Sequence, residues 1–140
     1  MQPRQNAQQE VGLLIELSKV GAAMGLTEAV NWIMSNDFDP DYTLFQGKHA
    51  RGGKASFYLA TVCDFYHSVG TLVKAGALSP ELTVEYFEVL PLWQRVQNWI
   101  AGQTDDACGQ IWPNFKYLGA VAEELADGAP DPVAAVNGTG

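Results

Sequence analysis

The segment from Lys54 to Ala75 constrains the fold more than any other part of the sequence. At helical spacing it carries Leu59, Val62, Cys63, Tyr66, Val69, Gly70 and Val73. Much of the opposite side of such a helix would be covered by Phe57, Tyr58, Phe65 and Leu72. Because a helix that is apolar nearly all round lies at the centre of a bundle, this segment predicts a central helix with other helices packed around it.

Helical spacing continues through the rest of the chain, whereas β-branched alternation is almost absent. Further helices are predicted over about residues 7–20, from an N-cap at Thr27, from about 79 to 100, and from about 105 to 127. Gly102 is expected to end the fourth helix, and prolines are expected to interrupt the last two, at Pro91 and Pro113. Turn residues predict a long loop near 36–53. The predicted fold class is therefore an all-α, single-domain bundle of about five helices over residues 1–127, with an irregular C-terminal tail at 128–140.

The corner between the third and fourth helices has strong local signals. Gly76 is expected to end the third helix with a positive φ angle. Ser79 is expected to cap the next helix with its side chain, Pro80 to occupy its first position, and Glu81 to lie near the positive end of its dipole. The two long helices should therefore meet at residues 76–80.

Composition narrows the possible functions. The chain has 140 residues, of which 47% are hydrophobic and 17% charged, and its formal net charge is −8. Such a charge disfavours nucleic-acid binding, and no apolar run is long enough to span a membrane. The polar start of the chain does not resemble a signal peptide, so a cytoplasmic location is expected. The two cysteines, Cys63 and Cys108, form no C-x-x-C motif, and no cofactor is expected.

A longer pattern resembles a known family. The segment Tyr66–Leu82 contains G-x-L-V-K-x-G-x-L, followed by E-L, by an acidic and aromatic helix, and by Asn114-Phe115-Lys116-Tyr117-Leu118. Together these pieces resemble a widespread group of small bacterial helical proteins, a domain of unknown function. The resemblance implies an all-helical fold and no particular activity. The arginines often found in that group's short second helix are replaced here by Asn31 and Ser35.

Two groups of residues have part of the pattern of a metal or catalytic site, but neither has the complete pattern. Cys63 and Asp64 lie within one helical turn of His67, a spacing that can present metal ligands or an acid–imidazole pair. The alternative is that Cys63 belongs to the core and that Asp64 pairs with His67 at the helix surface. The acidic stretch 37–41 resembles the start of a calcium loop, but it has Tyr42 where Gly is needed and Lys48 where Glu is needed. The carboxylates of this stretch are therefore expected to be solvated loop residues, and no metal site is predicted.

The basic segment 48–54 is the most suggestive. Three of the eight basic residues, Lys48, Arg51 and Lys54, fall within it, which leaves five bases against 16 acids, or −11, in the rest of the chain. These cations beside a helix start are candidates to bind an anion. The alternative is that they pair with the neighbouring acidic loop at 37–41.

No motif of a known catalytic class is present, including G-x-S-x-G, H-E-x-x-H and the Rossmann fingerprint. Enzyme activity is therefore disfavoured, and no catalytic residue is assigned. The leading hypothesis is a non-catalytic interaction or assembly module with an unknown protein partner or a second copy. Its candidate interface residues are Trp32, Trp93, Trp99 and Trp112. The alternatives are a small-ligand or anion-binding protein that uses the basic segment and, less favoured, a metal-dependent enzyme that uses Asp64 and His67.

Overall fold

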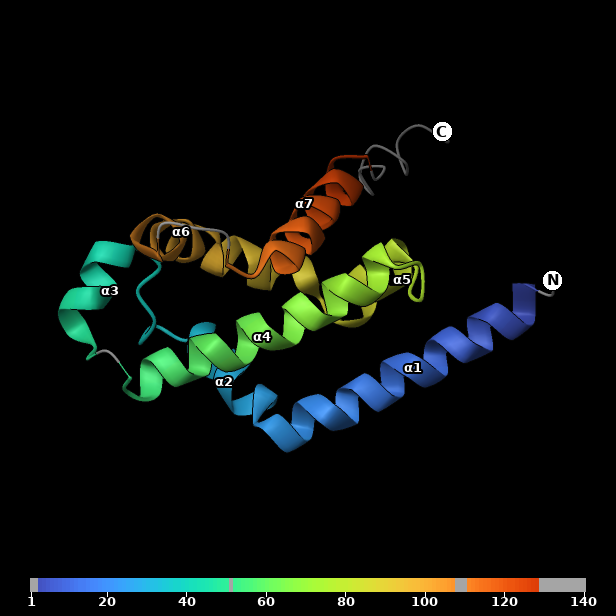
Figure 1. Ribbon diagram of the computed structural model, residues 1–140, viewed down its shortest axis with the longest axis horizontal. Coiled ribbons are helices and arrows are strands. Elements are labelled where there is room, and N and C mark those ends of the chain that lie inside the picture. The colour runs from blue at the N-terminus through green and yellow to red at the C-terminus, as the bar shows by residue number, and fades with distance from the viewer. Residues whose placement is uncertain (1–2, 51, 108–110, 129–140) are drawn as a thin grey trace, which may run out of the picture.

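The computed structural model describes residues 3–50, 52–107 and 111–128. The predicted all-α class is confirmed, because this described part contains helices and no strand (Figure 1). None of its helices is long and apolar enough to cross a membrane. The described helices number seven instead of about five: α1 (Pro3–Met24), α2 (Leu26–Ile33), α3 (Tyr42–Lys48), α4 (Lys54–Lys74), α5 (Pro80–Tyr86), α6 (Val89–Ala107) and α7 (Pro113–Gly128).

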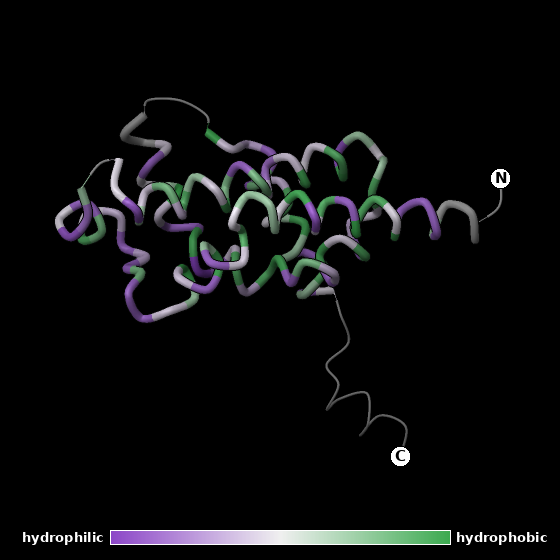
Figure 2. The backbone as a smooth tube through the Cα atoms, turned by 90° about the horizontal axis from the view of Figure 1, so that it is seen from below, coloured by the Kyte–Doolittle hydropathy of each residue, from purple (hydrophilic) through white to green (hydrophobic). Residues whose placement is uncertain are grey.

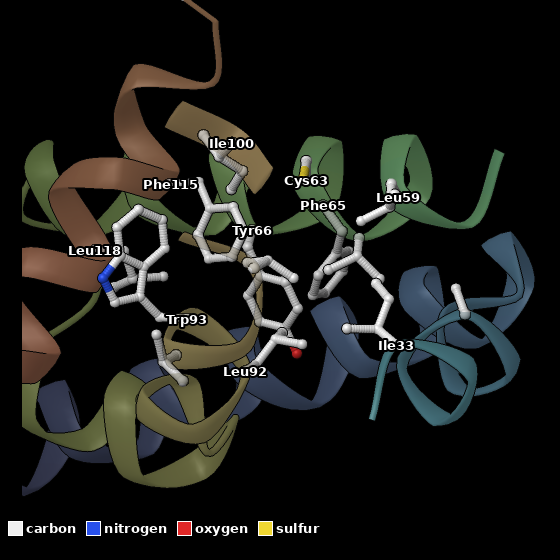
Figure 3. Close-up of a cluster of buried hydrophobic side chains, with 14 of the residues drawn as sticks. Ile33, Leu59, Cys63, Phe65, Tyr66, Leu92, Trp93, Ile100, Phe115 and Leu118 are labelled. Carbon is white, nitrogen blue, oxygen red and sulfur yellow. The ribbon is translucent and has the colours of Figure 1, made fainter. Parts of the chain in front are cut away.

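The central helix is α4, as its apolar periodicity predicts. It packs against α2 and against α7. Its buried side chains meet those of α2, α6 and α7 in one core (Figure 3). Within that core Phe115 stacks on Tyr66 with ring centroids 5.5 Å apart, and Trp93 meets the edge of Phe115 at 5.3 Å. Burial of these large rings is the main source of stability that the fold offers.

The predicted fourth helix is divided into α5 and α6, and this correction has a local cause. The chain breaks at Phe87 and Glu88, where Glu88 takes a positive φ of 49°. Phe87 turns its ring edge-on to Phe65 and Tyr66, at centroid distances of 5.7 and 5.8 Å. Pro91 does not interrupt the helix, because it lies in the first turn of α6, where its missing N–H has no intrahelical acceptor to lose.

The end of α6 also differs from the prediction. The helix continues through Gly102 to Ala107, so Gly102 is not a terminator and no new helix starts at 105. A Cβ at Gly102 would overlap the Tyr42 side chain of α3. This glycine therefore serves a close contact between α6 and α3, a short helix inside the stretch 36–53 that was expected to be a loop. Pro113 starts α7 instead of interrupting a helix.

The first helix is longer than expected, and the second starts at another residue. The helix predicted over 7–20 runs from Pro3 to Met24. Gly25, with a φ of 80°, separates it from α2, which starts at Leu26. Thr27 is thus inside α2 and is not its N-cap. Figure 1 shows α1 running beside the body of the molecule, and in Figure 2 its N-terminal end projects beyond the other helices.

The corner between α4 and α5 confirms the expected role of Gly76. Its φ is 84°, and its N–H donates to the Val73 carbonyl at 3.0 Å, while the Ala77 N–H donates to the Leu72 carbonyl at 2.9 Å. These two bonds form a Schellman motif. Pro80 occupies the first position of α5, as predicted. The Ser79 side chain, however, makes no capping bond; instead its backbone N–H donates to Glu10 of α1.

Substitutions at two positions of this corner, 76 and 79, should therefore differ in their effect on stability. Gly76→Val is expected to cost about 1–2 kcal/mol of unfolding free energy, because a β-branched residue is strained at positive φ. Gly76→Asn should cost less, since Asn tolerates this conformation. Ser79→Ala should change stability by no more than about 0.5 kcal/mol, because no side-chain cap is lost. Urea unfolding measures all three, and a loss for Ser79→Ala as large as that for Gly76→Val would contradict the assignment.

Candidate functional site

The two halves of the sequence pattern meet in space where α7 starts against α4. Gly70 lets the Asn114 backbone come so close that a Cβ at position 70 would overlap the Asn114 carbonyl. The Asn114 side chain donates to Thr71 Oγ1 at 2.6 Å, and Lys74 lies 5.4 Å from the centre of the Tyr117 ring. The pattern therefore describes a helix–helix junction, and each of these residues has a packing or hydrogen-bonding role in it.

Asp64 and His67 belong to the same junction. Asp64 accepts a hydrogen bond from Trp112 Nε1 at 2.7 Å, and His67 Nδ1 accepts one from the Asn114 backbone N–H at 3.1 Å. Each side chain thus holds the start of α7, where Trp112 has a positive φ of 47°. In the described part of the chain, no three His, Cys, Asp or Glu side chains come together as metal ligands would. The third residue of the triplet, Cys63, is buried and carries a free thiol.

Burial shifts the acidity of two side chains on α4. The pKa of the Cys63 thiol is raised well above its usual range by burial, with a further contribution from the negative charge of Asp64. Burial, together with the charge of Glu88, raises the pKa of Tyr66 from 10.0 to about 12. A thiol that stays protonated is a poor nucleophile, so Cys63 has the character of a core residue.

These shifts predict a loss of stability in alkali. The unfolded chain releases the Tyr66 proton from about pH 10, whereas the folded chain keeps it until about pH 12. Below the pKa values of the unfolded chain, both side chains are protonated whether the chain is folded or not, and this contribution to stability is complete. As pH rises from the pKa of each group in the unfolded chain through its pKa in the folded chain, the contribution is lost. Urea unfolding at rising pH should show the decline, and Tyr66→Phe should reduce its slope. A stability that stays flat up to pH 12 would contradict the burial effect.

The acidic stretch 37–41 has local structural roles. The Asp41 side chain caps α3 by accepting from the Leu44 N–H at 2.9 Å. Asp39 accepts from Lys48 Nζ and from the Asp41 N–H, each at 3.0 Å, and the bond from Lys48 contributes most to lowering the pKa of Asp39. One of the three cations proposed to bind an anion is thus already paired with the acidic loop.

The other two cations are placed differently. Lys54 starts α4, with its Nζ 4.0 Å from Glu28 Oε1 and 5.5 Å from the centre of the Tyr58 ring. The pKa of Lys54 is raised, first by its interaction with Tyr58 and then by Glu28. Arg51 lies outside the described residues. Among the described side chains, Lys48 and Lys54 thus have different acidic partners, Asp39 and Glu28.

Beside Lys54 is a small pocket of about 230 Å³, lined by Trp32, His49, Lys54, Ala55 and Tyr58. Three of these side chains are aromatic rings, which sequence spacing alone did not group with the basic segment. Among the residues that the structure describes, the buried His49 Nε2 has no hydrogen-bond partner. Because a buried polar atom without a partner is costly, this atom is a place where a ligand could gain binding energy.

The four tryptophans lie in or against the core. Trp93 and Trp99 are only 9% and 5% exposed, and Trp32 and Trp112 are half-buried against the core. Trp93 donates from Nε1 to Glu123 at 3.0 Å, and Trp112 stacks on Trp99 at 6.2 Å. These rings do not form an exposed patch, so the surplus of tryptophan gives no support to an interface at these positions.

Four of the exposed large hydrophobic side chains among the described residues lie on α1; the others, Met34, Leu44, Phe57 and Tyr86, are spread over other parts of the fold. Val11 and Ile15 face outward on one side of the helix, and Val20 and Met24 face outward on another; all four are 39–51% exposed. Between them Leu14 is buried and holds α1 to the body. A gap of about 750 Å³ lies between the first half of α1 and the Gly76–Pro80 corner. The helix predicted over 7–20 ended before Met24, so the exposed pair Val20 and Met24 was not recognised, although the two residues are spaced as i, i+4.

Comparison with known proteins adds no relative. No protein-family model, no curated protein and no solved structure matches this chain. The resemblance to the helical domain of unknown function therefore stays a prediction.

Arg95 of α6 is a further residue that sequence reasoning missed. Its Nε donates to the Ile33 carbonyl at 2.8 Å, and its Nη2 donates to the carbonyls of Ser35 at 2.6 Å and Phe38 at 3.0 Å. The guanidinium also lies over the Phe38 ring, 5.4 Å from its centre. Arg95 thus fastens the turn after α2 to α6. No local signal marks this role, because the three acceptors are backbone atoms about sixty residues away.

Proposed function

We propose that this chain is a non-catalytic interaction or assembly module, that α1 is its docking element, and that the partner is a second copy of the chain. The observation that carries the proposal is the pair of exposed apolar sides on α1. A helix that is apolar on more than one side is normally buried on those sides. Here the body of the molecule covers only the side that bears Leu14.

Charge does not oppose self-association at this surface. Of the charged residues on α1 close to Val11 and Ile15, Glu16 and Lys19 form a salt bridge of 3.1 Å with each other, and Glu10 accepts a hydrogen bond from the Ser79 backbone N–H. Since two copies carry the same net charge of −8, added salt should screen their repulsion and strengthen the association.

The test is light scattering from micromolar to hundreds of micromolar protein. The wild-type mass should rise with concentration, and it should rise further in salt. Val11→Lys with Ile15→Lys should remain monomeric, because both substitutions place charges on the apolar side. A matched control, Gln94→Lys with Asn98→Lys, adds the same charge with the same i, i+4 spacing at exposed polar positions of α6 and should associate as the wild type does.

Circular dichroism of each variant checks that the helices are retained. A wild-type chain that stays monomeric at every concentration and salt would contradict the proposal. So would equal loss of association in both double variants, because the effect would then follow total charge and not the apolar side.

The pocket beside Lys54 supports a second candidate, a small-ligand or anion-binding protein. Its support is the combination of three aromatic rings, one cation and the unpartnered His49 Nε2. Calorimetric titration with phosphate and pyrophosphate tests it, on the wild type and on the variant with Lys48, Arg51 and Lys54 all replaced by Ser. Heat from the wild type alone would support this function, and equal heat or none would contradict it.

The metal-dependent enzyme is the least supported alternative. Asp64 accepts a hydrogen bond from the Trp112 side chain, and His67 accepts one from the Asn114 backbone N–H, so both side chains are engaged in holding the start of α7. This arrangement gives no support to a catalytic role for them.

A further inference from the structure

A groove lies between α5 and the end of α7, and none of the residues that line it belongs to α1. It has a volume of about 630 Å³ and is lined by Pro80, Glu81, Val121, Glu124, Leu125 and Gly128. Pro80, Val121 and Leu125 are half-buried and form an apolar floor. Glu81 from α5 and Glu124 from α7 are exposed on its two sides. The volume is in the range of about 300–1,000 Å³ typical of ligand clefts.

The carboxylates of this groove have no cation nearby on their own helices, since the one cation of α7, Lys116, lies eight residues before Glu124 and donates to Thr104 Oγ1 at 2.7 Å. The sequences of α5 and of residues 117–128 contain no Lys, Arg or His. Among the described residues, neither Glu81 nor Glu124 takes part in a salt bridge within 4.0 Å. Glu123 is different, because it accepts from Trp93 Nε1 and so faces the core. The groove thus combines an apolar floor with two unpaired negative charges on opposite sides.

We infer that this groove binds a basic amphipathic segment of another protein, with an apolar side chain on Leu125 and Val121 and with Lys or Arg reaching Glu81 and Glu124. The charge complementarity selects this occupant, since an apolar floor alone would accept any helix. Residues 129–140, which follow α7, contain one acid and no base, so their charge does not match the groove. A second copy is disfavoured for the same reason, because the chain is strongly acidic.

The inference goes beyond the proposed role of α1, and salt separates the two. Binding of a basic segment to carboxylates weakens as salt screens the attraction, whereas self-association through α1 should strengthen. The variant Val11→Lys with Ile15→Lys should therefore bind the basic segment as the wild type does. Failure of either proposal is then visible without the other.

The probe is a fluorescent peptide with Leu and Lys at helical spacing, followed by anisotropy as the full chain is titrated. Replacing Glu81 and Glu124 by Gln should weaken binding about fivefold to tenfold, as expected for two exposed charge pairs. Replacing Glu16 by Gln and Asp37 by Asn removes the same charge elsewhere and should leave binding nearly unchanged. Leu125→Lys should abolish binding while its circular dichroism spectrum stays that of a folded chain.

Three results would overturn the inference. The first is no binding of the Leu–Lys peptide, or equal binding of the same peptide with Glu in place of Lys. The second is an equal loss in the two charge-removing variants, which would assign the attraction to net charge alone. The third is an affinity that does not fall with salt.

Discussion

Gly70→Ala is expected to destabilise the fold by about 2–3 kcal/mol, a large effect for a single methyl group. A Cβ at position 70 would overlap the carbonyl oxygen and carbon of Asn114, which are backbone atoms at the start of α7. They cannot rotate away as the end of a flexible side chain would, so α7 must shift from α4. Such a shift also disturbs the stacking of Phe115 on Tyr66. Urea unfolding measures this cost, and the slope of the unfolding free energy against urea concentration should stay unchanged.

Gly47→Ala is the matched control. It makes the same chemical change within helix α3, where a Cβ would meet nothing within 4 Å. It should be neutral or stabilising by up to about 1 kcal/mol, because Ala is the better helix former. If Gly70→Ala were as stable as the wild type, the close approach of α4 and α7 would be wrong.

Arg95→Met is expected to cost about 2–4 kcal/mol. The substitution keeps most of the side-chain length, but it removes three charge-assisted hydrogen bonds to the carbonyls of Ile33, Ser35 and Phe38. Arg95→Lys should lose less, since an ammonium can still reach part of the set but lacks the planar fork. Thermal unfolding followed by circular dichroism ranks the three proteins.

Lys19→Met is the control for the loss of a cation. Lys19 is exposed and pairs with the exposed Glu16, so its replacement should change stability by no more than about 0.5 kcal/mol. Equal stability of Arg95→Met and Lys19→Met would show that the turn after α2 does not depend on the guanidinium.

Those parts of the fold that depend on local spacing were predictable. The all-round apolar pattern of α4 identified the central helix, and Gly76 with Pro80 identified the corner. The break between α5 and α6 was not predictable, because Phe87 and Glu88 are neither Gly nor Pro and the positive φ of Glu88 accompanies the packing of the Phe87 ring on α4. The prediction that Gly102 ends a helix was wrong for a related reason. The role of this glycine is a close contact with Tyr42, which lies on a helix sixty residues away in the sequence.

In the candidate sites, too, features set by local spacing were predictable and features set by distant contacts were not. The sequence marked Asp64 and His67 as a pair, yet each bonds a different atom of the distant α7 start, which no spacing reveals. Tryptophan count suggested an interface, but how much of each ring is exposed depends on the assembled core. The sequence contains the exposed pairs of α1 as i, i+4 repeats; only the structure shows that the body of the molecule leaves them uncovered.

Hydrogen exchange of the α1 backbone amides, at low and at high protein concentration, is the most direct test of whether α1 is a docking element. If a second copy covers Val11 and Ile15, exchange in α1 should slow as concentration rises, while exchange in the buried part of α4 stays the same. The Val11→Lys and Ile15→Lys double variant should show no such change. Amides of α1 that exchange at one rate across the whole concentration range, in a chain that remains monomeric, would contradict the proposed role of this helix.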